Sequence, residues 1–172
     1  YWLIGPLDGT EGFVTKTGEF CINIALMEDN HPCLGIIHVP LTHETFYGYN
    51  GKAELYYQGK TTPLRTRTLP PQGMILLTGG YGKKHQIQED FFLKALPIAK
   101  VERLRSALKF TRIAAGAADL YVRFEPCHEW DTAAGHALIE AAGGVMTNLD
   151  GTPFLYGKPD LLNHEFAVFG RK

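Results

Sequence analysis

The sequence has few cysteines, no long hydrophobic run and no excess of either charge. Its three cysteines are an odd number without CxxC spacing, which argues against a disulfide framework or a zinc site and favours a reducing, cytoplasmic setting. No stretch approaches the roughly 20 apolar residues that span a bilayer, so no membrane span is expected. The 17 Lys and Arg nearly balance the 18 Asp and Glu, so no overall field attracts a nucleic acid polymer, and any anion site must be local.

Length and composition are those of an ordinary globular chain. With 172 residues, of which 45% are hydrophobic, the chain can bury a sizeable core in one compact domain or two small lobes. Its first residues, Tyr-Trp-Leu-Ile, have the composition of a strand already under way, and no initiator Met precedes them. We therefore expect residues to be missing upstream, which would leave apolar sheet surface uncovered and make a homo-oligomer possible.

The first third of the chain has the pattern of an antiparallel meander. Short β-rich runs at residues 20–27, 34–39, 45–49 and 53–57 are separated by turn signals such as Asn50-Gly51. Residues 59–73 contain three prolines and little periodicity, which is typical of a connector. We predict a sheet lobe over 1–60, with the metal loop at its start, and a connector over 61–73.

Beyond the connector, the pattern predicts alternating strands and helices over 74–172. Strands are expected at 74–78, 119–122, 145–147 and 166–169, and helices at 86–95 and 106–115. A further helix is expected at 131–142, opening with Asp131 at a capping position and stopping at Gly143-Gly144. The predicted fold class is therefore layered α/β (α+β), an antiparallel-sheet lobe followed by a smaller α/β lobe with the Trp-Asp motif.

One candidate for chemistry is a turn-rich loop directly after the first strand. It reads Gly5-Pro6-Leu7-Asp8-Gly9-Thr10. An Asp on such a loop can bind a hard cation, while backbone N–H groups and the Thr hydroxyl can hold phosphate oxygens. Because Asp-Gly is a common turn dipeptide, an ordinary surface turn is the alternative.

A second candidate lies at the start of the predicted helix at 131–142. It reads Glu129-Trp130-Asp131-Thr132-Ala133-Ala134-Gly135. An Asp beside small residues at a helix end lets a ligand approach closely and can bind a cation there. The alternative is an Asp that caps a well-packed helix and contributes stability alone.

Taken together and in this order, the two motifs resemble the paired signatures of the inositol-monophosphatase superfamily. The stretches at 18–26, 108–110 and 118–124 look like its 3′(2′),5′-bisphosphate nucleotidase branch, of CysQ type. The resemblance covers nearly the whole chain and implies a sugar-phosphatase-like fold. It also implies a Mg²⁺-dependent phosphomonoesterase that converts adenosine 3′,5′-bisphosphate to AMP and phosphate.

The resemblance also assigns roles to particular residues. Mg²⁺ would be held by the Leu7 carbonyl, Asp8 and Asp131, with Asp8 and Thr10 as the catalytic groups. Gly9 and Thr10 would contact the phosphate that is removed, and Thr10 would orient the attacking water. Lys109 would contact the second phosphate or the nucleotide. The small phosphorylated substrate would thus be bound by Leu7, Asp8, Gly9, Thr10, Lys109 and Asp131.

The sequence departs from the family pattern at several positions. Gly5 stands where the family has an Asp that bridges two metals, and the upstream Glu ligand is not in the chain. Arg105-Ser106-Ala107 stands where Gly-Ser-Ser is usual, and Gly12 stands where the branch tends to have an acidic residue. Three alternatives therefore stay open: a bisphosphate nucleotidase, a phosphatase for inositol monophosphate or a sugar bisphosphate, and an inactive protein that keeps the phosphatase fold.

Overall fold

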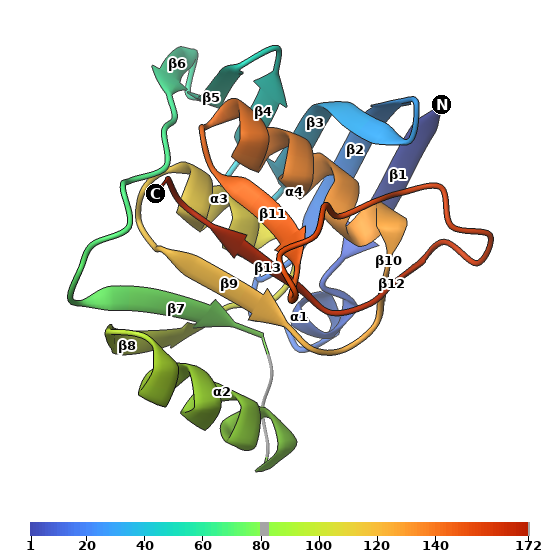
Figure 1. The fold of residues 1–172 in the computed structure, drawn as a ribbon. Coiled ribbons are helices and arrows are strands. Elements are labelled where there is room, and N and C mark those ends of the chain that lie inside the picture. Colours follow the sequence, from blue (N-terminus) through green and yellow to red (C-terminus); the bar gives the residue numbers. More distant parts are fainter. Residues whose placement is uncertain (80–82, 172) are drawn as a thin grey trace.

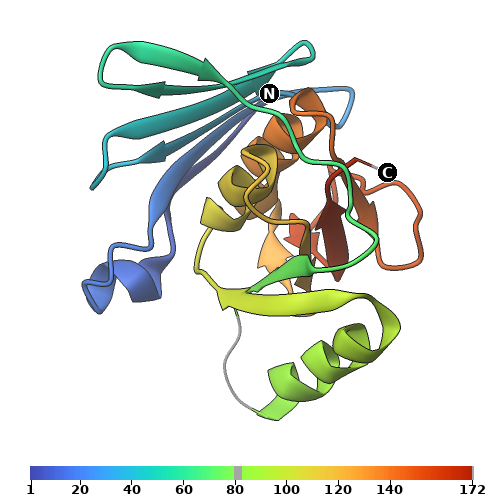
Figure 2. The ribbon, with the colours of Figure 1, turned by 90° about the vertical axis from the view of Figure 1, so that its left-hand side faces the viewer.

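The computed structural model describes residues 1–79 and 83–171 as two sheets with helices between them. A six-stranded antiparallel sheet forms one layer, helices α3 and α4 lie in the middle, and a five-stranded mixed sheet forms the next layer (Figures 1 and 2). Helix α2 lies on the outer face of the mixed sheet. None of the helices described is long and apolar enough to cross a membrane.

The six-stranded sheet follows chain order and confirms the predicted meander. Its strands are β1 (Trp2–Asp8), β2 (Cys21–Glu28), β3 (His31–Val39), β4 (Glu44–Tyr49), β5 (Lys52–Tyr57) and β6 (Lys60–Pro63). Strand β2 alternates buried and half-buried residues because one face packs on the helices. Strand β6 was not predicted: its residues are polar and exposed, and they lie at the start of the expected connector.

The mixed sheet has the order β11-β13-β9-β7-β8, and β7 runs parallel to both of its neighbours. Its strands are β7 (Met74–Thr78), β8 (Ile98–Arg103), β9 (Leu120–Arg123), β11 (Val145–Asn148) and β13 (Phe166–Phe169). A small ladder joins β10 (Cys127–His128) to β12 (Leu162–Asn163). Four of the five strands were predicted, whereas β8 was missed because its mixed polar and apolar residues do not alternate regularly.

The helices are α1 (Thr10–Val14), α2 (Lys83–Ala95), α3 (Leu108–Ala114) and α4 (Glu129–Ala141). Helix α4 packs closely on the antiparallel sheet because glycines face it. A Cβ at Gly35 would lie 2.1 Å from the Ala134 carbonyl oxygen, and a Cβ at Gly48 would lie 2.6 Å from the Leu138 Cα. The backbones of sheet and helix therefore touch directly, which fixes where the N-terminus of α4 lies.

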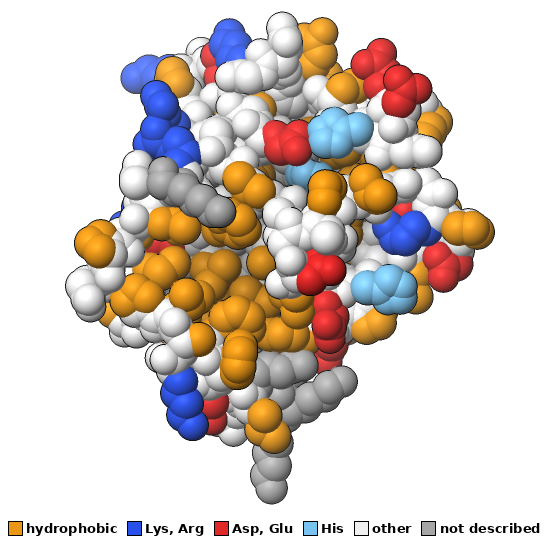
Figure 3. Space-filling view, viewed as in Figure 1, with side chains coloured by type: hydrophobic (Ala, Val, Ile, Leu, Met, Phe, Trp, Pro, Cys, Tyr) orange, Lys and Arg blue, Asp and Glu red, His pale blue; other side chains and the backbone are white. Residues whose placement is uncertain are grey.

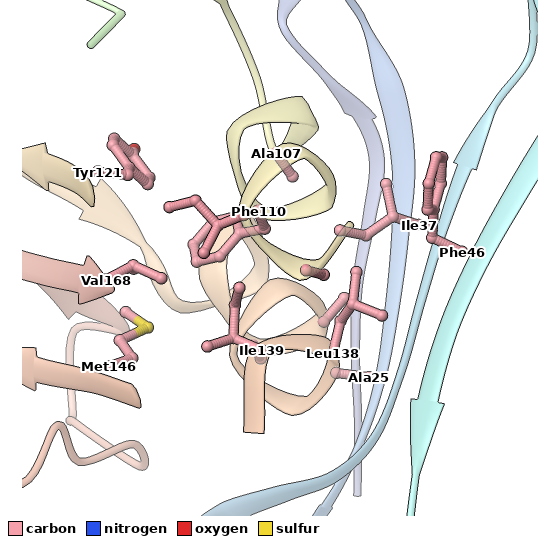
Figure 4. Packing of buried hydrophobic residues seen from close by; sticks show 14 of the residues in the cluster. Ala25, Ile37, Phe46, Ala107, Phe110, Tyr121, Leu138, Ile139, Met146 and Val168 are labelled. Atoms are coloured by element: carbon pink, nitrogen blue, oxygen red, sulfur yellow. The ribbon is translucent and has the colours of Figure 1, made fainter. Parts of the chain in front are cut away.

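One hydrophobic core joins the two parts of the chain. On one side of α4, Leu138 faces Ile37 and Phe46 of the antiparallel sheet, and on the other side Ile139 faces Met146 of the mixed sheet (Figure 4). A second cluster lies on the far face of the mixed sheet, where hydrophobic side chains gather over β7, β9 and β13 (Figure 3). The division at 61–73 stays a prediction, since both parts share this core.

Candidate active site

A cavity of about 270 Å³ lies where the two halves of the chain meet. Its lining residues come from the end of β1, the start of α1, the ends of β7 and β9, and the segment before α3. They are Asp8, Gly9, Thr10, Glu11, Thr78, Gly79, Arg105, Ser106, Lys109, Tyr121, Val122, Arg123, Phe124 and Glu125. Positive and negative side chains thus share a polar cavity, as an anionic substrate with a cation would require.

The segment 5–10 is not the simple turn that the sequence predicts. Strand β1 continues as far as Asp8, with an irregularity in its pairing to β2 between Gly5 and Asp8. Gly9 then takes a left-handed conformation, φ 87°, and a Cβ there would lie 2.4 Å from the Glu19 carbonyl oxygen. Thr10 begins α1, so the fold brings Asp8, Gly9 and Thr10 to the cavity, whereas Leu7 is not among its described lining residues.

Asp8 is held by donors from two other elements. Its Oδ2 accepts a hydrogen bond from the Ala107 backbone N–H at 2.5 Å and one from Asn23 Nδ2 at 3.2 Å. The Cys21 thiol lies 3.7 Å from the same oxygen, and burial, with the charge of Asp8, raises the pKa of this thiol to about 12. Cys21 therefore stays protonated, and it donates to Asp8 rather than acting as a nucleophile.

Asp131 is the third residue of α4, in its first turn, and is not the N-cap that the sequence predicts. The helix begins at Glu129 with His128 as N-cap, and Asp131 Oδ2 accepts a hydrogen bond from the His128 backbone N–H at 2.9 Å. Burial raises the pKa of Asp131, the His128 hydrogen bond acts against that rise, and the charge of Asp8 adds to it. The two motif carboxylates are therefore close enough to repel each other, although Asp131 does not line the cavity as described.

Gly5 is the point at which the two motifs touch. A Cβ at Gly5 would lie 3.0 Å from the Trp130 carbonyl oxygen and 3.5 Å from the Asn23 Cβ. The Trp130 ring stacks on the His128 ring with centroids 4.2 Å apart, which fixes the first turn of α4. The end of β1 and the start of α4 are thus packed together without a side chain at position 5.

The donors present fit one hard cation better than two. In the described part of the chain, no group of three or more His, Cys, Asp or Glu side chains converges as a metal site. Asp8 and Asp131 are two carboxylates whose mutual repulsion a cation would relieve, and the Leu7 carbonyl lies next to Asp8 in the chain. Mg²⁺ is commonly bound by one or two carboxylates, with water and substrate phosphate completing its shell.

Lys109 forms the inner wall of the cavity. Its side chain is buried, and Nζ donates to the carbonyl oxygens of Leu104 and Ser106, both at 2.8 Å. Nζ also lies 4.9 Å from the centre of the Tyr121 ring, and burial lowers the pKa of Lys109 to about 8. The predicted substrate contact thus lines the cavity while it also holds the segment before α3.

Two basic residues of the cavity were not predicted as site residues. Arg123, at the end of β9, donates from Nε to the Glu125 carbonyl at 3.0 Å, and Arg105 forms ion pairs with Glu11 and Glu19. Arg123 lies in the stretch 118–124 that carries the family resemblance, so that stretch contained a signal for it. For Arg105 the signal was its departure from the usual Gly.

The chain is similar in sequence to proteins of known family. The model of the inositol monophosphatase family matches residues 1–167. The 3′(2′),5′-bisphosphate nucleotidase CysQ of Salmonella typhimurium is 36% identical over 170 residues, which is 98% of this chain and 67% of that protein. The CysQ of Escherichia coli K12 is 35% identical over 169 residues, again 98% of this chain and 67% of that protein.

Solved structures give the same result and confirm the predicted fold class. The crystal structure of CysQ from Bacteroides thetaiotaomicron has a TM-score of 0.89 at 29% identity, covering 99% of this chain and 70% of that chain. An inositol monophosphatase from Anabaena has a TM-score of 0.81 at 29% identity, covering 99% of this chain and 69% of that one. The chain thus spans about two thirds of the length of these relatives.

Proposed function

The chain belongs to the inositol monophosphatase family, and from that premise we propose that it acts as a Mg²⁺-dependent phosphatase on adenosine 3′,5′-bisphosphate. The observation that carries the proposal is that the two motifs pack together, with Gly5 against the Trp130 carbonyl, beside a cavity lined by Asp8 and basic side chains. The substrate class is supported by the curated relatives, which are 3′(2′),5′-bisphosphate nucleotidases. The family itself consists of metal-dependent phosphatases.

The proposed cation site consists of the Asp8 and Asp131 carboxylates and the Leu7 carbonyl. The chemistry that a bound Mg²⁺ supplies is charge neutralisation on the phosphate and a lower pKa for an attacking water. Gly9 and Thr10 lie in the cavity wall, where they hold the phosphate that is removed. The Thr10 hydroxyl orients the water, whose oxygen bonds to phosphorus as the bond to the 3′ oxygen breaks, and a water proton goes to the leaving oxygen.

The basic wall of the cavity favours a substrate with a second phosphate. Lys109 and Arg123 line the same cavity as Asp8, Gly9 and Thr10. Two phosphates carry more charge than one, so they gain more from this wall than inositol monophosphate does. The bisphosphate reading therefore ranks above the inositol reading.

Gly5 supports a second candidate, an inactive protein that keeps the phosphatase fold. The Cβ position at residue 5 faces the Trp130 carbonyl, and no carboxylate can project from it. A cation pair that shares a ligand at this position therefore lacks that ligand. On this reading the cavity binds phosphate compounds without hydrolysing them.

Calorimetric titration of Mg²⁺ with adenosine 3′,5′-bisphosphate present, followed by a phosphate-release assay on the same sample, separates these candidates. The proposed function predicts binding of Mg²⁺ and faster release from the bisphosphate than from inositol monophosphate. Faster release from inositol monophosphate would reverse the substrate assignment. A folded chain that binds no Mg²⁺ and releases no phosphate, whether or not it binds the bisphosphate, would support the inactive protein.

A further inference from the structure

Arg105 joins two segments that are far apart in the sequence. Its Nη2 lies 3.0 Å from Glu11 Oε1, and its Nη1 lies 3.2 Å from Glu19 Oε2. The Arg105 side chain is 20% exposed and that of Glu19 25%, so the pair with Glu19 is partly shielded from water, whereas Glu11 is 71% exposed. Glu11 lies in the first turn of α1 and Glu19 lies shortly before β2, so one guanidinium contacts both the start and the end of segment 9–19.

The segment that carries Arg105 is also held from inside. Lys109 Nζ donates to the carbonyls of Leu104 and Ser106, the residues on either side of Arg105. Ser106 has a φ of 57°, a left-handed conformation that is strained in a residue other than Gly. A backbone in this conformation persists only where its surroundings fix it, and Lys109 and Arg105 supply fixed points on opposite sides.

This segment sets the position of Asp8. The Ala107 N–H donates to Asp8 Oδ2 at 2.5 Å, directly after Arg105 and Ser106. The Ser106 Cβ would lie 2.9 Å from a Cβ at Gly9, and the Glu19 carbonyl would lie 2.5 Å from a Cβ at Gly12. Residues 9–19 and residues 104–107 are therefore in direct contact beside the candidate catalytic groups.

We propose that Arg105 is a positioning residue, which fixes segment 9–19 against segment 104–107 and so sets the places of Asp8 and Thr10 in the cavity. Helix α1 has five residues, which is too short to be stable by itself, so its position depends on contacts of this kind. The role in turnover rests on the proposed function, whereas the role in holding the segment does not. Because a displacement of about 1 Å can cost about 100-fold in rate, the tie acts on kcat.

The test compares Arg105→Ala with Arg112→Ala. Arg112 is the matched control because it forms an ion pair of the same length, 3.2 Å, with Glu102 on the α3 side of the molecule, outside the cavity. Arg105→Ala is expected to lower kcat for adenosine 3′,5′-bisphosphate by about 10- to 100-fold, with KM within about threefold of the wild type. Arg112→Ala is expected to leave both constants unchanged.

A second readout does not need enzymatic activity. Lys16 lies exposed on the turn after α1, where the folded backbone resists cleavage. Release of segment 9–19 lets the peptide bond after Lys16 enter the active site of trypsin. Arg105→Ala is expected to raise the rate of cleavage after Lys16 about tenfold, and Glu19→Gln to raise it more than Glu11→Gln because Glu19 is more buried. Arg105→Lys, which keeps one ion pair, is expected to recover part of the protection and serves if the alanine variant does not fold.

The possible results separate the two proposals. Unchanged cleavage after Lys16 in the folded Arg105 variants would overturn the positioning role. A rise in KM with kcat retained would also overturn it, because Arg105 would then be a substrate ligand. Absence of turnover in the wild-type protein, together with faster cleavage in Arg105→Ala, would remove the proposed function and leave the positioning role supported.

Discussion

Asp8 and Asp131, the two motif carboxylates, are held in different ways. Asp8 accepts hydrogen bonds from the Ala107 backbone and the Asn23 side chain, which come from separate parts of the chain. Asp131 accepts a hydrogen bond from the His128 backbone, three residues earlier in its own helix turn. The first carboxylate is therefore placed by tertiary contacts and the second by local helix capping.

The difference assigns the two carboxylates different physical roles. Donors from two elements fix the orientation of Asp8, so it is a rigid part of the cavity wall. Burial and the charge of Asp8 raise the pKa of Asp131, so the ionised carboxylate costs the fold more stability than a solvated one would. Ionised Asp131 thus lowers the stability of the fold, and the same carboxylate is a candidate ligand for the cation.

Replacing Asp131 by Asn is expected to have the largest effect. The amide keeps an acceptor for the His128 N–H but removes the charge, so Mg²⁺ binding is lost, and phosphate release falls about 1000-fold, which corresponds to about 4 kcal/mol of transition-state stabilisation. The same variant is expected to melt at a higher temperature than the wild type at pH 7 without metal. Calorimetric titration, kinetics and thermal unfolding check the three outcomes.

The sign of the stability effect follows from the direction of the pKa shift. A raised pKa in the folded state means that the protonated form of Asp131 stabilises the fold, and that this contribution is lost as pH rises through the folded pKa. The advantage of Asp131→Asn is therefore expected to shrink as the pH falls through the folded pKa and to be absent below the unfolded value of 3.8. Asp150→Asn is a matched control of opposite sign, because hydrogen bonds from Thr152 lower the pKa of the exposed Asp150. A lower melting temperature for Asp131→Asn at pH 7 would contradict the assignment.

Gly5→Asp tests whether the strand that carries Asp8 can provide a further carboxylate ligand for Mg²⁺. The new carboxylate would lie between the two motifs and is expected to tighten Mg²⁺ binding about 10- to 100-fold, or about 1.4–2.7 kcal/mol, and to raise the number of bound ions from one to two. Its Cβ would lie 3.0 Å from the Trp130 carbonyl, so α4 must shift by a few tenths of an ångström. Weaker Mg²⁺ binding in a folded variant would mean that this contact excludes the side chain.

Elements whose structure depends on the local residue pattern were predicted correctly from the sequence. The four strands of the meander, strand β7 and strand β13 follow from β-rich runs and turn residues, and the helix at 131–142 follows from its composition and its terminal glycines. The motif residues Asp8, Gly9 and Thr10 all line the cavity. Their individual roles stay predictions.

What the sequence could not supply are the contacts between distant segments. The extension of β1 through Pro6 to Asp8 depends on pairing with β2, although Pro6 and Gly5 predict a turn. The donors to Asp8 come from residues 15 and 99 positions away, and the Arg105–Glu19 pair spans 86 positions. No local period carries such information, because it arises from packing.

Asn23→Ala tests whether Asp8 depends on its tertiary donors. Asn23 is buried and donates to Asp8 Oδ2 at 3.2 Å, so its removal leaves a carboxylate with one hydrogen bond fewer. We expect a loss of about 1.5–3 kcal/mol in the free energy of unfolding and a five- to tenfold lower kcat, roughly, because Asp8 is less well oriented. Chemical denaturation and phosphate release measure the two quantities. A variant that loses stability but keeps kcat would show that Ala107 alone orients Asp8.

The charge of Lys109 is expected to have the smallest effect on KM, and Lys109→Met shows it most clearly in the pH dependence. Burial lowers the pKa of Lys109 to about 8, so the wild-type side chain loses its charge between about pH 7 and pH 9. The KM for the bisphosphate is therefore expected to rise about two- to threefold over this range in the wild type and to stay flat in Lys109→Met.

The stability of the wild type changes in the opposite sense. Because the folded pKa of Lys109 lies below the unfolded value of 10.5, the wild type binds fewer protons when folded, and it becomes more stable relative to the variant between about pH 8 and pH 10. Kinetics at several pH values and melting temperatures at pH 7 and pH 9.5 check both trends, and parallel KM profiles in the two proteins would mean that Lys109 holds the segment before α3 without contributing its charge to substrate binding.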